Sequence, residues 1–188
     1  TASPAARVEN ATPTIPGNDN AARSYAQLRE DWLAGVPCKA PCWESITPGE
    51  TLAEAAIEKI TTTTIFTNTK VNREYGYVAT NLVAVDETGE PGPIYVIIDF
   101  TPFLDGGTVQ TISLWFPPAT LGQLITSFGA PTHIHAWYGN YPEDPEETYW
   151  EIEILWLPAG LAMRADGKGS PPDIDEALSL SSALYFIP

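Results

Sequence analysis

Apolar side chains recur at helical spacing in two segments that each begin with a capping box. In the first, Thr51 can accept a hydrogen bond from the Glu54 amide while the Glu54 carboxylate reaches back to the Thr51 amide. In the second, Thr120 and Gln123 repeat this arrangement, and Gly129 is expected as the left-handed C-terminal cap. The apolar stripes of the two helices are formed by Leu52, Ala55, Ala56, Ile60, Leu121, Leu124, Ile125 and Phe128.

A further helix and two sets of strands complete the predicted elements. The helix spans about residues 21–34, where Asn20 can cap it and Gly35 stops it. Strand-like segments with alternating or continuous apolar residues follow each of the two capped helices. The first set is 61–67, 75–85, 94–100 and 109–116, and the second is about 132–138, 147–157, 159–164 and 181–187.

The two sets of elements resemble each other in order and spacing. Thr51 and Thr120 are separated by almost the same number of residues as Leu114 and Leu184, which open the similar sequences Leu-Trp-Phe-Pro and Leu-Tyr-Phe-Ile. Any capped helix followed by strands could look alike, which leaves a chance similarity open. The pattern favours a duplication, and hence an α+β fold of two tandem helix-on-antiparallel-sheet units.

An extended N-terminal tail precedes these units in the predicted organisation. The parts are a tail or linker at 1–20, a first unit at 21–117 and a second unit at 118–188. The tail is rich in Ala, Thr, Pro and Asn and has few large apolar side chains, so it cannot bury enough surface to order itself. We expect it to be a linker left after removal of a signal peptide. Asn10-Ala-Thr12 fits the N-glycosylation acceptor pattern, and its modification is left open.

The charge of the chain disfavours two classes of partner. Lys+Arg number 9 against Asp+Glu 24, a formal net charge of −15, and the cations are scattered rather than clustered. Without a basic stripe the protein cannot neutralise a row of phosphates, so nucleic acid and an anionic membrane surface are both poor candidates as partners. No apolar run approaches the roughly 20 residues of a membrane helix, and we expect no membrane insertion.

The only two cysteines are Cys38 and Cys42, which are separated by Lys-Ala-Pro. Zinc would need two further ligands, and a redox dithiol more usually has two intervening residues at the start of a helix. Because the pair lies in a Pro-bearing loop between two predicted helices, we predict a structural disulfide. A disulfide is typical of an oxidising compartment, which indicates an extracellular or cell-surface location.

Three short motifs together resemble those of a known group of proteins. They are the proline-flanked Cys42-Trp43, the helix start Gly49-Glu-Thr51 and the helix end Phe128-Gly-Ala-Pro131. This combination resembles exported bacterial proteins of the β-lactamase-inhibitor-protein-like superfamily, which includes small outer-membrane assembly lipoproteins of the SmpA/OmlA type. The resemblance covers about residues 38–188, and it departs at Glu50, where an apolar Met or Val is usual. It implies helices on one face of an antiparallel sheet, the other face free to bind protein, and no catalytic activity.

Two pairs of polar residues could carry chemistry. Glu151 and Glu153 share one face of a predicted strand, about 6.6 Å apart, which is within the range of a glycosidase acid–base pair, although solvation alone produces the same alternation. His133 and His135 likewise share a face and could bind zinc or copper, but no third ligand follows from the spacing. The sequence also lacks a nucleophile elbow and a phosphate-binding loop. We therefore predict a protein that is not an enzyme and that holds no metal and no cofactor.

Aromatic residues are numerous, with 6 Trp, 8 Tyr and 6 Phe. Trp115 and Tyr185 would occupy equivalent outward positions in a duplicated fold, and Trp137 is outward on its own strand. Exposed aromatic rows mark protein interfaces, so we predict that these three residues bind a partner. The open alternative is that the rings cover the second face of the sheet or lie under loops.

These inferences lead to two functional hypotheses. The first is a non-catalytic exported structural protein, a self-assembling subunit of an extracellular filament or surface layer whose N-terminal tail docks on a neighbouring copy. The second is a soluble or cell-surface protein-binding module or inhibitor that uses the exposed aromatic sheet face. In both, the partner is a protein, either another copy of this chain or a different one.

Overall fold

A single β-sheet organises the described part of the chain. The computed structural model describes residues 23–85, 91–100, 107–141 and 144–188. Its helices are α1 (Tyr25–Ala34), α2 (Ala53–Thr62), α3 (Leu121–Phe128) and the short 3-10 helix η1 (Leu157–Ala159). Its strands are β1 (Arg23–Ser24), β2 (Phe66–Asn72), β3 (Tyr77–Val85), β4 (Pro91–Phe100), β5 (Val109–Thr120), β6 (His133–Tyr141), β7 (Asp144–Trp156), β8 (Leu161–Lys168) and β9 (Ser179–Tyr185).

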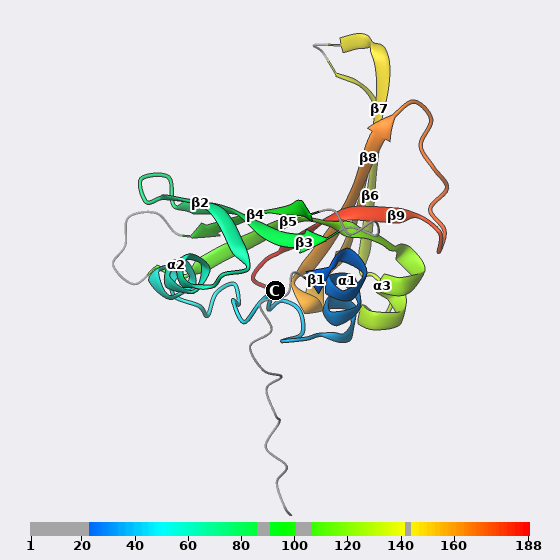
Figure 1. Ribbon diagram of the computed structural model, residues 1–188. Coiled ribbons are helices and arrows are strands. Elements are labelled where there is room, and N and C mark those ends of the chain that lie inside the picture. Colours follow the sequence, from blue (N-terminus) through cyan, green and yellow to red (C-terminus); the bar gives the residue numbers. More distant parts are fainter. Residues whose placement is uncertain (1–22, 86–90, 101–106, 142–143) are drawn as a thin grey trace, which may run out of the picture.

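The strands are ordered β1-β3-β4-β5-β9-β8-β7-β6, and β2 pairs with β3 on the same side as β1. The short β1 is parallel to β3, whereas the other described pairings are antiparallel. Figure 1 shows α1, α2 and α3 on the same face of the sheet, and it shows β6, β7 and β8 rising steeply from the level of β3, β4 and β5. The sheet is therefore bent, and no described helix covers its other face.

The prediction of two tandem helix-on-sheet units is wrong. Strands assigned to different units join in one sheet, because β5 pairs with β9 in a register that sets Ile112 opposite Tyr185 and Leu114 opposite Ala183. These four side chains are buried on the helix-covered face, and pairing the two strands protects edges that separate units would expose. In the part of the chain that the structure describes, β-structure thus predominates, with three short α-helices and the 3-10 helix η1 beside it. The predicted tail at 1–20 lies outside the described residues.

Only the second of the two predicted capping boxes is present. At α3 the Gln123 amide donates to Thr120 Oγ1 over 3.3 Å, and the Thr120 amide donates to Gln123 Oε1 over 2.9 Å. Helix α2 instead begins after Leu52, which makes no side-chain cap. Thr51 is used differently: its hydroxyl accepts from the Thr47 amide over 2.8 Å, and its carbonyl accepts from the Val109 amide over 2.9 Å. Pairing with the start of β5 thus overrides the local capping pattern.

Helix ends differ from the predictions in two further places. Ser24 caps α1 by accepting from the Gln27 amide over 3.1 Å, so the helix starts later than predicted, while Gly35 ends it as expected in the left-handed conformation. Gly129 ends α3 with φ 81° and ψ −171°, which is a positive φ but not the predicted left-handed helical cap.

The predicted strands are present with shifted ends, except the first. Residues 61 and 62 still belong to α2, and β2 begins only at Phe66. The hydroxyls of Thr61 and Thr62 donate to the carbonyls of Ile57 and Glu58, which keeps these β-branched residues in the last helical turn.

A continuous apolar core fills the space between the helices and the sheet. Where α1 and α3 meet the sheet, the core is aromatic. The Phe128 ring lies 5.6 Å from the Trp32 ring and 6.3 Å from the Trp156 ring, measured between centroids. Trp156 Nε1 also donates to the Gly129 carbonyl over 2.8 Å, which attaches the end of α3 to β7. The helices thus fix the sheet from one side and leave the other side accessible.

Candidate functional site

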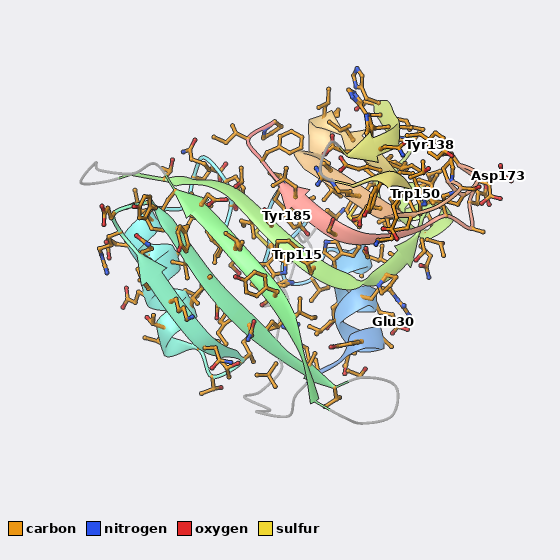
Figure 2. The ribbon with its side chains drawn as sticks, turned by 90° about the horizontal axis from the view of Figure 1, so that it is seen from above. Glu30, Trp115, Tyr138, Trp150, Asp173 and Tyr185 are labelled. Carbon is orange, nitrogen blue, oxygen red and sulfur yellow. A yellow bond between two sulfur atoms is a disulfide. The ribbon has the colours of Figure 1, made fainter. Side chains whose placement is uncertain are left out.

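The side of the sheet without helices is the candidate site, and we call it the open face. Its side chains come from five adjacent strands and from the edge strand beyond them. We define it by Tyr95, Trp115, Ser182, Leu184, Ala162, Arg164, Glu151, Glu153, His133, His135 and Trp137. Figure 2 looks onto this face from above, with Trp115 on β5 near the middle of the view.

Strand register aligns the central residues of the open face in one row. Trp115 lies opposite Ser182, and Ser182 lies opposite Arg164 on β8. Arg164 in turn lies opposite Glu153, and Glu153 lies opposite His135 on the edge strand. Because side chains of directly opposed residues point to the same face, residues distant in sequence become neighbours here.

A hollow of about 230 Å³ lies in the middle of this row, where the sheet bends. Trp115, Glu153, Arg164, Ser182 and Leu184 contribute to its lining. Pockets that enclose a small-molecule ligand usually measure about 300–1,000 Å³. The hollow is therefore better matched to one side chain of a protein partner than to a free ligand.

Acidic groups outnumber basic groups beside the hollow. Arg164 lies 3.4 Å from a Glu151 carboxylate oxygen and 3.7 Å from a Glu153 oxygen, and Asp166 lies opposite Glu151 on the next strand. Arg164 thus pairs with two carboxylates, and together with Asp166 these four side chains carry an excess of two negative charges. The Arg164 side chain is 48% exposed, so each of its ion pairs stabilises the fold only weakly.

Two of the three predicted partner-binding residues lie on the open face. Trp115 is 51% exposed and packs against Tyr95 with 5.3 Å between ring centroids, and Trp137 is 43% exposed. Tyr185 is fully buried, which corrects its predicted outward position. It lies opposite Ile112 and not at a position equivalent to Trp115, and its hydroxyl accepts a hydrogen bond from Trp32 Nε1 in the core.

The two pairs considered for catalysis or metal binding lie on the same face. Glu151 and Glu153 are both engaged by Arg164. His133 and His135 are exposed, with 6.4 Å between ring centroids. Across the described ranges no group of three or more His, Cys, Asp or Glu side chains is arranged to hold a metal ion.

The predicted disulfide between Cys38 and Cys42 is confirmed, with an S–S distance of 2.09 Å. It closes the loop between α1 and α2. That loop also contains a short antiparallel bridge between Trp43 and Ile46, both of which are buried. The disulfide therefore shapes the helix-covered side of the protein and contributes no group to the open face.

Sequence reasoning missed Arg164 and Tyr95. Arg164 could have been found, because the predicted strands 147–157 and 159–164 are joined by a tight turn, and pairing them as a hairpin sets Arg164 opposite Glu153. Tyr95 lies on β4, which pairs with the next strand β5, but the register of that pair shifts between Asp99 and Phe100 and could not be predicted. Ser182 could not be placed either, since its position opposite Trp115 depends on the pairing of β5 with the distant β9.

Comparison with known proteins adds no relative. No protein-family model matches the chain, and neither the curated proteins nor the solved structures contain a match.

Among the helices of the described residues, none has the length and apolarity required to cross a membrane.

Proposed function

We propose that this chain is a non-catalytic protein-binding module whose partner docks on the open face. The observation that carries this proposal is Trp115, a large ring left 51% exposed beside a hollow on the face of the sheet that no described helix covers. Burying such a ring against a partner removes apolar surface from water, and Trp, Tyr and Arg are the residues most often found to dominate binding energy. Tyr95, Trp115 and Arg164 together supply all three types.

The charges of the open face indicate the chemistry of the partner. Glu151, Glu153 and Asp166 exceed the single positive charge of Arg164. A Lys or Arg side chain entering the hollow would find the Glu153 carboxylate and the Trp115 ring in its lining, and it would share Glu153 with Arg164. Both contacts favour a cation. We therefore expect a partner segment that presents a basic side chain between apolar ones.

The cellular location and the alternative function also remain proposals. The confirmed disulfide supports an exported protein, since disulfides persist outside the reducing cytosol. Self-assembly into a filament or surface layer through residues 1–20 rests on residues outside the described part of the chain, and deletion of that segment tests it. Membership of the β-lactamase-inhibitor-protein-like superfamily stays a prediction as well.

Site-specific photo-cross-linking tests the proposed function and captures the partner in the same step. A photoreactive amino acid at position 182 lies in the hollow, whereas one at position 30 lies on an exposed position of α1, on the helix-covered side. The two proteins are irradiated in the culture medium and extract of the cells that encode the chain. We expect a discrete cross-linked protein from position 182 and none of the same mass from position 30.

Two results would contradict partner binding on the open face. Equal cross-linking from both positions would mean that contacts are random. A discrete product from position 30 alone would place the partner on the helix-covered side.

A further inference from the structure

The strand β6 forms a sheet edge with unusual properties. Among the described residues it pairs only with β7, at the end of the strand order. Residues 133–138 are all exposed, so both faces of the strand are in contact with solvent. Ile134 is 47% exposed and Tyr138 is 58% exposed. An edge strand of this kind offers backbone donors and acceptors, together with apolar side chains, to another strand.

From His133 to Asn140 the edge lacks the features by which proteins usually prevent pairing, and its register with β7 shifts only beyond this stretch, between Asn140 and Tyr141. From His133 to Asn140 the sequence contains no Asp, Glu, Lys, Arg or Pro, although the whole chain has a net charge of −15. The strand β2, beside β3 at the other side of the sheet, is different. There Lys70 is exposed, and the pairing with β3 shifts between Thr67 and Lys70, where Asn68 has a φ of 53°. A charge and an irregular register both discourage the addition of a strand.

We propose that the β6 edges of two copies pair antiparallel about a two-fold axis, so that two sheets become one continuous sheet. The sequence of β6 is self-complementary in this arrangement. With Ala136 on the axis, Ile134 of each copy lies opposite Tyr138 of the other, and His135 lies opposite Trp137. Directly opposed aromatic and β-branched side chains stabilise antiparallel pairs. Moving the axis to His135 sets Ile134 opposite Ala136, which loses the Ile134–Tyr138 contact.

The charge of the chain favours contact between two copies at this edge rather than at the acidic parts of the surface. Two chains with a net charge of −15 each repel, so contact is less unfavourable through a segment that carries no acidic side chain of its own. The β6 edge is such a segment. A two-strand interface is small, which makes the dimer concentration-dependent, and added salt strengthens it by screening the repulsion.

The proposed dimer has a consequence for the open face. A two-fold axis perpendicular to the sheet keeps the same face of both copies on the same side. The two open faces would then be presented together, and a partner with two suitable segments could bind both. The dimer does not depend on the proposed function, since β6 can pair at the edge without a partner on the open face, although His135 and Trp137 belong to both surfaces.

Sedimentation velocity over a concentration series tests the proposal with the full chain. We expect the wild type to shift from monomer to dimer, and Ile134→Lys to remain monomeric at every concentration because it sets a charge into the pairing edge. Ile174→Lys is the matched control, since it adds the same charge at a loop isoleucine that is 43% exposed, and it should dimerise like the wild type. A wild type that stays monomeric overturns the proposal, as does dimerisation of Ile134→Lys equal to that of the control.

Disulfide trapping tests the register and does not depend on the lysine variants. Because both native cysteines are paired with each other, Ala136→Cys carries the only free thiol. In the proposed register the two introduced thiols face each other across the axis, and mild oxidation should give a covalent dimer in high yield. Thr67→Cys, on the exposed side of β2, is the control and should give little. Equal yields would show random collision and contradict pairing through β6.

Discussion

Gly160 occupies one of the most restricted positions in the protein. Its φ is 55°, and a Cβ atom there would lie 2.4 Å from the Phe186 carbonyl oxygen and 2.9 Å from Pro41 Cβ. The residue connects η1 to β8, and its carbonyl accepts from the Phe186 amide over 2.9 Å. The end of the chain, the disulfide loop and the β7–β8 turn therefore meet at a point where only glycine fits.

A pair of glycine substitutions separates this steric effect from backbone strain. Gly129 also has a positive φ, of 81°, but a Cβ there would meet nothing within 4 Å. We expect Gly129→Ala to lower the free energy of unfolding by about 1 kcal/mol through strain alone. Gly160→Ala should lower it by about 3 kcal/mol, because a clash with backbone adds to the strain. Urea unfolding of both variants measures the difference, and equal losses would contradict the close packing at Gly160.

Tyr185 is a buried side chain whose ionisation the fold opposes. Burial raises the pKa of Tyr185 well above its usual value, while the hydrogen bond from Trp32 acts in the opposite direction. The folded protein therefore holds the neutral phenol. Its contribution to stability is fully present below the unfolded pKa of about 10 and is lost as the pH rises above that value.

Substitution of Tyr185 by phenylalanine should change stability in a pH-dependent way. At about pH 8, Tyr185→Phe should be less stable than the wild type by about 1 kcal/mol, because the hydrogen bond from Trp32 is lost. Between about pH 9 and 11 the wild type should lose more stability than the variant, since only the wild type must keep this phenol protonated. Urea unfolding at a series of pH values tests this. Parallel pH profiles would mean that Tyr185 ionises freely in the folded protein.

The predicted exposure of Tyr185 failed for a definable reason. The similarity of Leu184-Tyr-Phe-Ile to Leu114-Trp-Phe-Pro suggested that Tyr185 and Trp115 point the same way. The register of β5 and β9 instead sets Trp115 opposite Ser182, so Tyr185 has the opposite orientation. A shift of one residue in a strand reverses every side chain, and sequence similarity alone does not fix the register.

At the scale of elements, the stability of α3 depends on side-chain capping at its N-terminus, whereas α2 has no side-chain cap. Thr120→Ala should lower the free energy of unfolding by about 1 kcal/mol, because it removes the side chain that accepts from the Gln123 amide. Thr126→Ala, on an exposed position of the same helix, should change it by less than about 0.5 kcal/mol. Thermal unfolding of the two variants gives the comparison, and equal effects would show that the capping box contributes nothing.

The elements were more predictable than their arrangement. Local chemistry identified α3, the end of α1 at Gly35 and most strands, because capping and apolar periodicity act over a few residues. Thr51 shows where prediction from local motifs fails. Its motif matches that of Thr120, yet Thr51 pairs with the start of β5 instead of capping α2. Strand order is a long-range property, and the apolar periodicity of β5 and β9 does not indicate that the two strands are neighbours. The disulfide was predictable because the chain has only two cysteines, close together.

At the scale of the whole molecule, the sheet separates the packed core from the face on which we propose that a partner binds. The helices, the aromatic core and the disulfide loop lie on one side, where they hold the sheet in its bent form (Figure 1). The other side gathers Trp115, Arg164 and Glu153 around a hollow, although they come from three different strands. Trp115 and Trp137 could be predicted as exposed from their strand positions. The hollow beside Trp115 could not, since it results from the joining of β5 to β9.

The binding affinity of an open-face variant tests the central claim most directly. Once the cross-linked partner is purified, its affinity is measured by calorimetry for the wild type, for Trp115→Ala and for Tyr75→Ala. Tyr75 is the control, because it is an aromatic side chain that is 70% exposed in the β2–β3 turn. We predict that Trp115→Ala weakens binding at least about 30-fold, as expected for a central interface residue, and that Tyr75→Ala changes it less than about 2-fold. Unchanged affinity of Trp115→Ala would contradict partner binding through the open face.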